Sequence, residues 1–153
     1  MKYIFDAWYM FALGIIPVCL IAIFITFLFL KWQLKNQVMI VLFLLMFISF
    51  FSLFIMRHMI RNEVSEHLDE YSFIISSSMD VDEQKLISAL KKQRYITTNR
   101  TRPEKINTLR IVINLGEIEL WIAEDSDNSD ICWVYYPKYL YSRSNEIGKI
   151  RIR

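Results

Sequence analysis

The residues that could do acid–base or metal chemistry in this chain are few and scattered. The only histidines are His58 and His67, and His67 has Glu63 and Glu70 about one helical turn away on either side. Such spacing can hold a metal ion, but it is also common on the solvated face of a helix. The sequence has no Ser/His/Asp or Cys/His arrangement, no CxxC motif and no phosphate-binding glycine loop. We therefore expect no catalytic residues, no cofactor and no metal site.

A cluster of four acidic residues superficially resembles a calcium-binding loop. Its members are Glu124, Asp125, Asp127 and Asp130. Counted from Asp125, the sixth position is Asp130 and the twelfth is Tyr136, where a calcium loop has Gly and Glu. The pattern therefore predicts a solvated polar loop over 124–130, with charge available for partner recognition.

A basic segment runs from Lys91 to Arg110 and contains seven Lys/Arg residues and one acid, Glu104. On the cytoplasmic side of a membrane, each basic residue near the surface would contribute about 1 kcal/mol of attraction to anionic lipids. The segment could equally meet an acidic protein partner, or form a solvated loop after a helix.

Aromatic residues suggest where a protein partner would bind. Trp121 is expected on the outward face of its strand, whereas Trp133 and Tyr135 share a face that could cover the core. Trp and Tyr dominate the energetics of protein interfaces. The predicted partner-binding residues are Arg100, Arg102, Trp121, Glu124, Asp125, Asp127 and Asp130.

Two apolar blocks, Ala7–Leu30 and Val38–Met56, contain no charged residue. As helices they would extend roughly 36 and 28 Å, close to the hydrocarbon thickness of a bilayer. A spanning segment must be helical because the bilayer offers no water to its backbone. The remaining chain is too short to bury two such helices in a soluble core. We therefore predict two transmembrane helices, the first retained as an anchor.

The flanking charges predict the orientation of these spans. The loop between them carries Lys31 and Lys35, whereas the other side carries Lys2, Arg57 and Arg61. The positive-inside rule then places both termini in the cytoplasm. No Asp, Glu, Lys, Arg or His lies within either span, which disfavours a transporter or channel.

The distribution of charge and the positions of the cysteines limit what the part of the chain after the spans can do. Residues 1–61 carry five Lys/Arg and one Asp, whereas residues 62–153 carry thirteen Lys/Arg and fifteen Asp/Glu. The second part lacks the strongly basic character of a nucleic-acid-binding domain. Cys19 lies in a span and Cys132 lies outside it, so we expect no disulfide.

After Met56 the pattern becomes amphipathic, with Ile60, Val64, Leu68 and Tyr71 at helical spacing. The second helix is therefore expected to continue as a stalk to about Ser72. Its apolar stripe could pack on the chain's own domain or on a second copy as a short coiled coil.

The remaining pattern predicts one helix and a sheet. Asp80 and Glu83 form a capping-box arrangement that would start a helix over Val81–Arg94. Residues then alternate between apolar and polar, with a turn at Gly116 that predicts an antiparallel hairpin. The expected strands cover 109–115, 118–122, 131–136, 147–152 and, as an extension of the sheet, 139–142.

The predicted fold is thus a membrane α-helical hairpin of two transmembrane helices, followed by a small α+β domain. Its antiparallel sheet would have four to five strands. The expected divisions are a hairpin over 1–56 with spans at about 7–30 and 38–56, a juxtamembrane stalk helix over 57–75, and a soluble domain over 76–153.

In architecture alone, two spans carrying a compact adhesive domain without catalytic residues are similar to bacterial immunity and exclusion proteins. The resemblance implies a non-enzymatic protein of the bacterial inner membrane that binds one cognate protein partner and no nucleic acid. Two alternatives remain: a ligand-sensing two-span effector that oligomerises to disturb the bilayer, and an accessory subunit of a larger membrane complex. The lipid bilayer is the second expected partner, and a homo-oligomer is a third.

Overall fold

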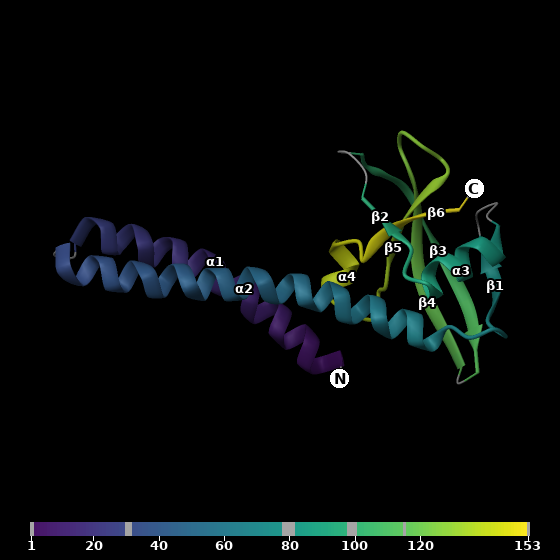
Figure 1. The fold of residues 1–153 in the computed structure, drawn as a ribbon, viewed down its shortest axis with the longest axis horizontal. Coiled ribbons are helices and arrows are strands. Elements are labelled where there is room, and N and C mark those ends of the chain that lie inside the picture. The colour runs from purple at the N-terminus through teal and green to yellow at the C-terminus, as the bar shows by residue number, and fades with distance from the viewer. Residues whose placement is uncertain (1, 30–31, 78–81, 98–100, 115, 153) are drawn as a thin grey trace. The chain divides into compact units, whose positions relative to one another are not determined.

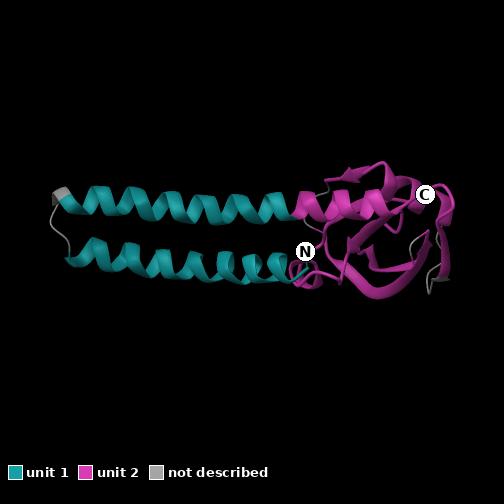
Figure 2. Ribbon diagram, turned by 90° about the horizontal axis from the view of Figure 1, so that it is seen from below, with its two compact units in different colours: residues 1–56 teal, residues 57–153 magenta. Residues whose placement is uncertain are grey.

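The chain is described by a computed structural model that covers residues 2–29, 32–77, 82–97, 101–114 and 116–152. It divides into two compact units, residues 1–56 and residues 57–153 (Figure 2). The first unit holds α1 (Lys2–Phe29) and most of α2 (Trp32–His67). The end of α2 belongs to the second unit together with the sheet.

Both helices of the first unit are long and apolar enough to cross a membrane, by length and composition. They lie side by side (Figures 1 and 2). The buried residues of α1 include Ala12, Cys19 and Thr26, at intervals of seven residues. A seven-residue interval keeps side chains on one side of a helix, and small side chains there let two helices lie close.

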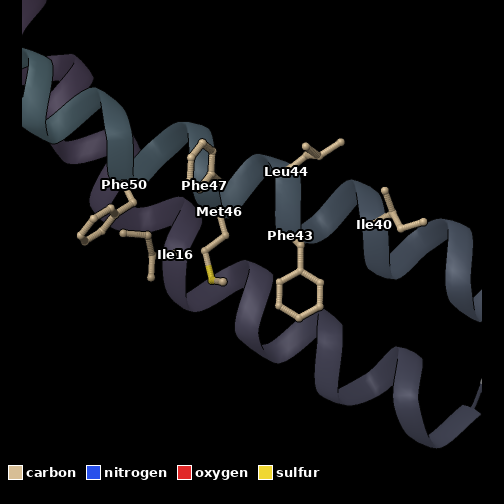
Figure 3. A pocket seen from close by; sticks show the side chains of 7 residues that line it. All are labelled: Ile16, Ile40, Phe43, Leu44, Met46, Phe47 and Phe50. Atoms are coloured by element: carbon tan, nitrogen blue, oxygen red, sulfur yellow. The ribbon is translucent and has the colours of Figure 1, made fainter.

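A groove of about 590 Å³ lies on this helix pair and is lined only by apolar side chains. Phe43 and Met46 extend from α2 towards α1, whereas Leu44 points away from it (Figure 3). Such a surface suits lipid chains or another apolar helix, and it offers no polar group to orient a ligand.

The second unit contains a six-stranded, wholly antiparallel sheet in the order β1-β3-β4-β5-β6-β2 (Figure 1). The strands are β1 (Phe73–Ser77), β2 (Tyr95–Ile96), β3 (Pro103–Ile113), β4 (Gly116–Asp125), β5 (Ile131–Tyr135) and β6 (Gly148–Arg151). The expected count of four to five strands is therefore wrong, because β1 and β2 were not foreseen. The sequence of β1 is Phe-Ile-Ile-Ser-Ser, in which apolar and polar residues do not alternate, and β2 is only two residues long.

The region predicted as a strand over 139–142 is instead the start of a short helix, α4 (Tyr141–Ser144). The strand β5 ends at Tyr135, and Pro137 follows two residues later. Proline has no N–H to donate to a ladder, so the sheet cannot continue there. The chain turns instead, with main-chain hydrogen bonds from Tyr139 to Tyr136 and from Ser142 to Tyr139.

The predicted hairpin is confirmed as β3 and β4, paired from Ile113 opposite Gly116 outward. Gly116 has a φ of 135°, a value that side-chain-bearing residues rarely adopt. One face of the sheet forms the core, and its buried residues include Leu109, Ile111, Ile118, Leu120, Ile122, Cys132, Val134 and Ile150. The opposite face, here called the outer face, carries Trp121 and its neighbours on the adjacent strands.

The end of α2 packs on the core of the second unit. Ile60, Val64 and Leu68 are buried, so the amphipathic stripe contacts the chain's own domain. Polar side chains fix the same segment: Arg57 Nε donates to the Tyr141 hydroxyl at 2.9 Å, and Gln93 Nε2 donates to Asn62 Oδ1 at 2.9 Å. The helix itself ends at His67, before the expected Ser72.

The helix α3 (Glu83–Lys91) is shorter than the predicted Val81–Arg94. Its N-cap is Asp82, whose carboxylate accepts from the Lys85 N–H at 3.0 Å. The predicted cap Asp80 lies outside the described residues. At the other end Gln93 has a φ of 49°, and Arg94 N–H bonds to the Ala89 carbonyl, which closes the helix as a Schellman motif.

Candidate partner-binding site

The position of Trp121 follows from strand register. Trp121 lies opposite Thr108 of β3 and opposite Tyr135 of β5, so all three residues belong to the outer face. Trp121 is half-buried, and its indole Nε1 donates to Glu119 Oε1 at 3.0 Å. The aromatic ring predicted to face outward therefore does so, held by a carboxylate two residues away on the same strand face.

A cleft of about 540 Å³ opens beside Trp121, here called the Trp121 cleft. One wall comes from the first half of β4 and the other from the segment that leaves β5. The lining residues are Glu117, Ile118, Glu119, Trp121, Tyr136, Pro137, Lys138 and Arg143. Two aromatic rings, a proline and four charged side chains meet there. Trp, Tyr and Arg are enriched at protein-binding surfaces, whereas Glu and Lys are more typical of the polar rim of such a surface.

The second wall is held by its own hydrogen bonds. The Tyr136 N–H donates to Ser142 Oγ at 2.7 Å in a buried position. Arg143 Nε donates to the Pro137 carbonyl at 3.0 Å. These two hydrogen bonds join groups within the segment itself, so neither of them depends on β4.

The α2 segment supports this wall from behind. Glu63 accepts hydrogen bonds from Lys138 Nζ and from the Tyr139 hydroxyl. Burial, and then the nearby Glu63 carboxylate, raise the pKa of Tyr136 to about 12. Tyr136 therefore stays neutral at physiological pH, and the Lys138 charge is already paired with Glu63. The acidic residues that line the Trp121 cleft are Glu117 and Glu119, and both are exposed to solvent.

The predicted site residue Asp125 lies in a different environment, at the far end of β4. Only 3 % of Asp125 is exposed. Its carboxylate accepts from Thr101 Oγ1, from Trp133 Nε1 at 2.8 Å and from the Asp127 N–H at 3.1 Å. Lys149 Nζ lies 3.8 Å from Asp125 Oδ2 and also 3.8 Å from the centre of the Trp133 ring.

These groups form one internal network, here called the Asp125 network (Asp125, Thr101, Trp133, Lys149). Burial alone would raise the pKa of Asp125, but the hydrogen bonds from Thr101, Trp133 and Asp127, together with the Lys149 ammonium, hold it below its ordinary value. The carboxylate is therefore charged at neutral pH. Its hydrogen-bonding capacity is used within the domain, so its role is structural support of the adjacent loop.

The other predicted residues divide between the strand end and the loop. Glu124 lies in β4 and is half-buried, so the polar loop begins at Ser126 rather than at Glu124. Asp127 is exposed and Asp130 is half-buried. Arg102 lies beside this loop, because the Ser126 N–H donates to the Arg102 carbonyl at 2.9 Å. The Arg102 side chain is exposed.

The structure thus brings Arg102 to the acidic loop but leaves Trp121 four residues away along β4, about 13 Å in an extended strand. Arg100 lies outside the described residues. The predicted surface is therefore two separate regions, and partner binding by either stays a prediction.

The histidine considered as a metal ligand, His67, makes a hydrogen bond within its own helix. His67 Nδ1 lies 2.6 Å from the main-chain carbonyl of Glu63, one turn earlier in α2. Among the residues that the structure describes, no group of three or more His, Cys, Asp or Glu side chains is placed to hold a metal ion.

Among the residues that line the Trp121 cleft, Trp121 is the one that the sequence predicted as a site residue. The other seven were not predicted, namely Glu117, Ile118, Glu119, Tyr136, Pro137, Lys138 and Arg143. The available signal was Pro137, which marks where β5 must stop while β4 continues. A long strand paired with a shorter neighbour leaves part of its edge uncovered, and this is where the cleft lies.

Comparison with known protein families, with curated proteins and with solved structures finds no match for this chain. We therefore infer a function from the chain's own geometry and chemistry.

Proposed function

We propose that this chain is a non-enzymatic membrane protein whose folded unit binds a cognate protein partner at the Trp121 cleft. The type of function is that of bacterial immunity or exclusion proteins, with two spans in the inner membrane and both termini in the cytoplasm. The observation that carries the proposal is the cleft itself, where Trp121 and Tyr136 lie beside the exposed carboxylates of β4.

The support is energetic. Trp, Tyr and Arg are the residues that most often dominate binding at protein interfaces, especially when they lie in a preformed depression. The Trp121 ring is fixed by Glu119, and the opposite wall is fixed by Ser142, so binding would cost little ordering of side chains.

The ligand-sensing effector remains the alternative, because the cleft could also accept a small molecule. Sites for small ligands are usually enclosed and mostly apolar. The Trp121 cleft instead carries four charged side chains, of which Glu117, Glu119, Lys138 and Arg143 are all exposed. This composition favours a protein surface over a small signal molecule.

The test is affinity purification of the full-length protein from its native membrane, in parallel with the Trp121→Ala variant. If the cleft binds the partner, one co-purifying protein falls by about tenfold or more, as expected for loss of a central Trp. The matched control is Tyr71→Ala, which removes an aromatic side chain that is 79 % exposed and does not line the cleft.

The Arg102→Glu variant separates the two predicted regions, because Arg102 lies beside the 126–130 loop and not in the cleft. Loss of the partner with Arg102→Glu but not with Trp121→Ala would move the site to the loop. An unchanged set of co-purifying proteins in both variants would contradict the proposal. A C-terminal reporter that is active only in the periplasm would contradict the orientation.

A further inference from the structure

The first half of β4 has an open edge at the Trp121 cleft. On one side β4 pairs with β3 along its whole length, from Gly116 to Asp125. On the other side it pairs with β5 only from Trp121 to Glu124. The strand β5 stops before it can cover the residues from Gly116 to Leu120, and the cleft occupies that place.

Strand pairing determines which main-chain groups face this edge. In an antiparallel ladder the N–H and C=O of one residue point to the same neighbouring strand, and successive residues alternate. The Val134 carbonyl accepts from the Ile147 N–H at 2.8 Å, so Val134 faces away from β4. Its neighbour Tyr135 must then face β4, where it lies opposite Trp121.

The same alternation can be followed along β4. Since Trp121 points its main-chain groups towards β5, Glu119 and Glu117 point theirs in the same direction, where β5 has already ended. Two N–H and two C=O groups therefore line the cleft. The pairing of β4 with β5 does not include Glu117 or Glu119. Within the described part of the chain, no turn or loop main-chain group bonds to them either.

The side chains around this edge define which strand would fit. A strand added to β4 would place alternate residues beside Glu117 and Glu119 on the outer face. Opposite charges on neighbouring strands stabilise a sheet and like charges destabilise it, so those positions favour Lys or Arg. The residues between them would lie against Ile118, Tyr136 and Pro137, which favours apolar side chains.

The net charge of the cleft agrees with a basic ligand. Glu117 and Glu119 supply two negative charges, whereas the positive charge of Lys138 is offset by its ion pair with Glu63. Arg143 remains as one cation, so the cleft is acidic by one charge.

We propose that the partner binds by strand addition: an extended segment of the partner protein, with Lys or Arg alternating with apolar residues, pairs with the open edge of β4 at Glu117–Glu119. This inference rests on the proposed function and specifies its chemistry. Main-chain hydrogen bonds supply affinity in this mode, and the alternating side chains supply specificity.

The test uses the full-length protein in phosphatidylcholine nanodiscs, whose neutral lipid does not attract a cationic peptide. The probe is a synthetic peptide of about seven residues, the length of a common strand, that alternates Lys and Val. One matched peptide has all its amide nitrogens methylated, which removes the main-chain donors and keeps every side chain. A second matched peptide has Glu in place of each Lys.

Strand addition predicts binding of the unmethylated Lys/Val peptide and at least about tenfold weaker binding of both matched peptides. Bound peptide should also slow amide hydrogen exchange in the segment that contains Glu117 and Glu119. The double variant Glu117→Lys/Glu119→Lys should weaken binding by a similar factor, whereas Glu104→Lys, an exposed site on β3, should leave it unchanged.

Absence of binding by the unmethylated peptide, or equal binding of the methylated one, would overturn strand addition. If partner capture from membranes still depended on Trp121 in that case, the proposed function would stand and only its mode would be wrong. If capture did not depend on Trp121 either, both proposals would fall.

Discussion

The outer face of the sheet carries acidic residues at both ends of β4. The two ends differ in how far those residues are buried and in which groups bond to them. At the loop end, Asp125 is buried and accepts hydrogen bonds from Thr101, Trp133 and the Asp127 main chain. At the other end, Glu117 and Glu119 are exposed beside an edge that β5 does not reach.

This difference separates a buried carboxylate with partners inside the domain from two exposed carboxylates at an open strand edge. A buried charge is tolerated only where partners replace the water it has lost, so the Asp125 network serves the fold. An exposed carboxylate on an open strand edge stabilises the fold little, and its charge remains available to a ligand. We therefore expect substitutions at the Asp125 end of β4 to lower stability, and we propose that the Glu117–Glu119 end binds the partner.

The largest expected effect is loss of stability on Asp125→Ala. The substitution leaves Lys149, whose side chain is only 11 % exposed, without its counter-charge, and it removes the acceptor for Trp133 and Thr101. Breaking one partner of a buried ion pair costs about 3 kcal/mol. Thermal unfolding of the full-length protein in nanodiscs should show a clear fall in the midpoint.

The control for this prediction is Asp127→Ala in the exposed loop, which should change stability by less than about 0.5 kcal/mol. Equal effects of the two variants would show that burial does not distinguish Asp125 from its neighbours, and the structural assignment of the Asp125 network would be wrong.

A smaller loss of stability is expected when the pH is lowered. The pKa of Asp125 is lower in the folded protein than its ordinary value of about 3.9, so the folded state binds this proton less tightly than the unfolded state. The stabilisation is fully present above the ordinary pKa and is lost as the pH falls towards and through the folded pKa.

The Asp125→Asn variant isolates this contribution, because Asn cannot titrate but can still accept a hydrogen bond from Trp133 or Thr101. Asp125→Asn should be less stable than the natural protein at neutral pH, and the gap should narrow as the pH falls below about 4. Unfolding midpoints of both proteins at several pH values measure this. A gap that stays constant would mean that Asp125 has no lowered pKa.

Local patterns in the sequence predicted the parts of the fold that have strong local signals. Uninterrupted apolar residues marked the two long helices, and alternation marked the hairpin of β3 and β4. The two edge strands carry no comparable signal, since β1 reads Phe-Ile-Ile-Ser-Ser without alternation and β2 has only two residues. At Tyr139–Ser142 the tyrosines suggested a strand, but Pro137 had already ended the sheet and the chain turned into α4.

The candidate site was predictable only in part, because its two regions depend on contacts between distant residues. Trp121 was identified from strand alternation alone. The burial of Asp125 was not, since its partners come from Thr101, Trp133 and Lys149, in three other parts of the chain. An acidic residue among other acidic residues is expected to be solvated, and only tertiary structure shows the exception.

The smallest expected effect on stability, and the sharpest test of the comparison, is the double variant Glu117→Gln/Glu119→Gln. Both side chains are exposed, and Gln at position 119 can still accept from Trp121 Nε1, so stability should change by less than about 0.5 kcal/mol. Partner binding should nevertheless weaken, because the two negative charges that match a basic strand are lost. Unfolding midpoints and partner capture from the same preparations measure both quantities. A large loss of stability with unchanged capture would reverse the assignment of the two ends of β4, because the exposed carboxylates would then serve the fold and not the partner.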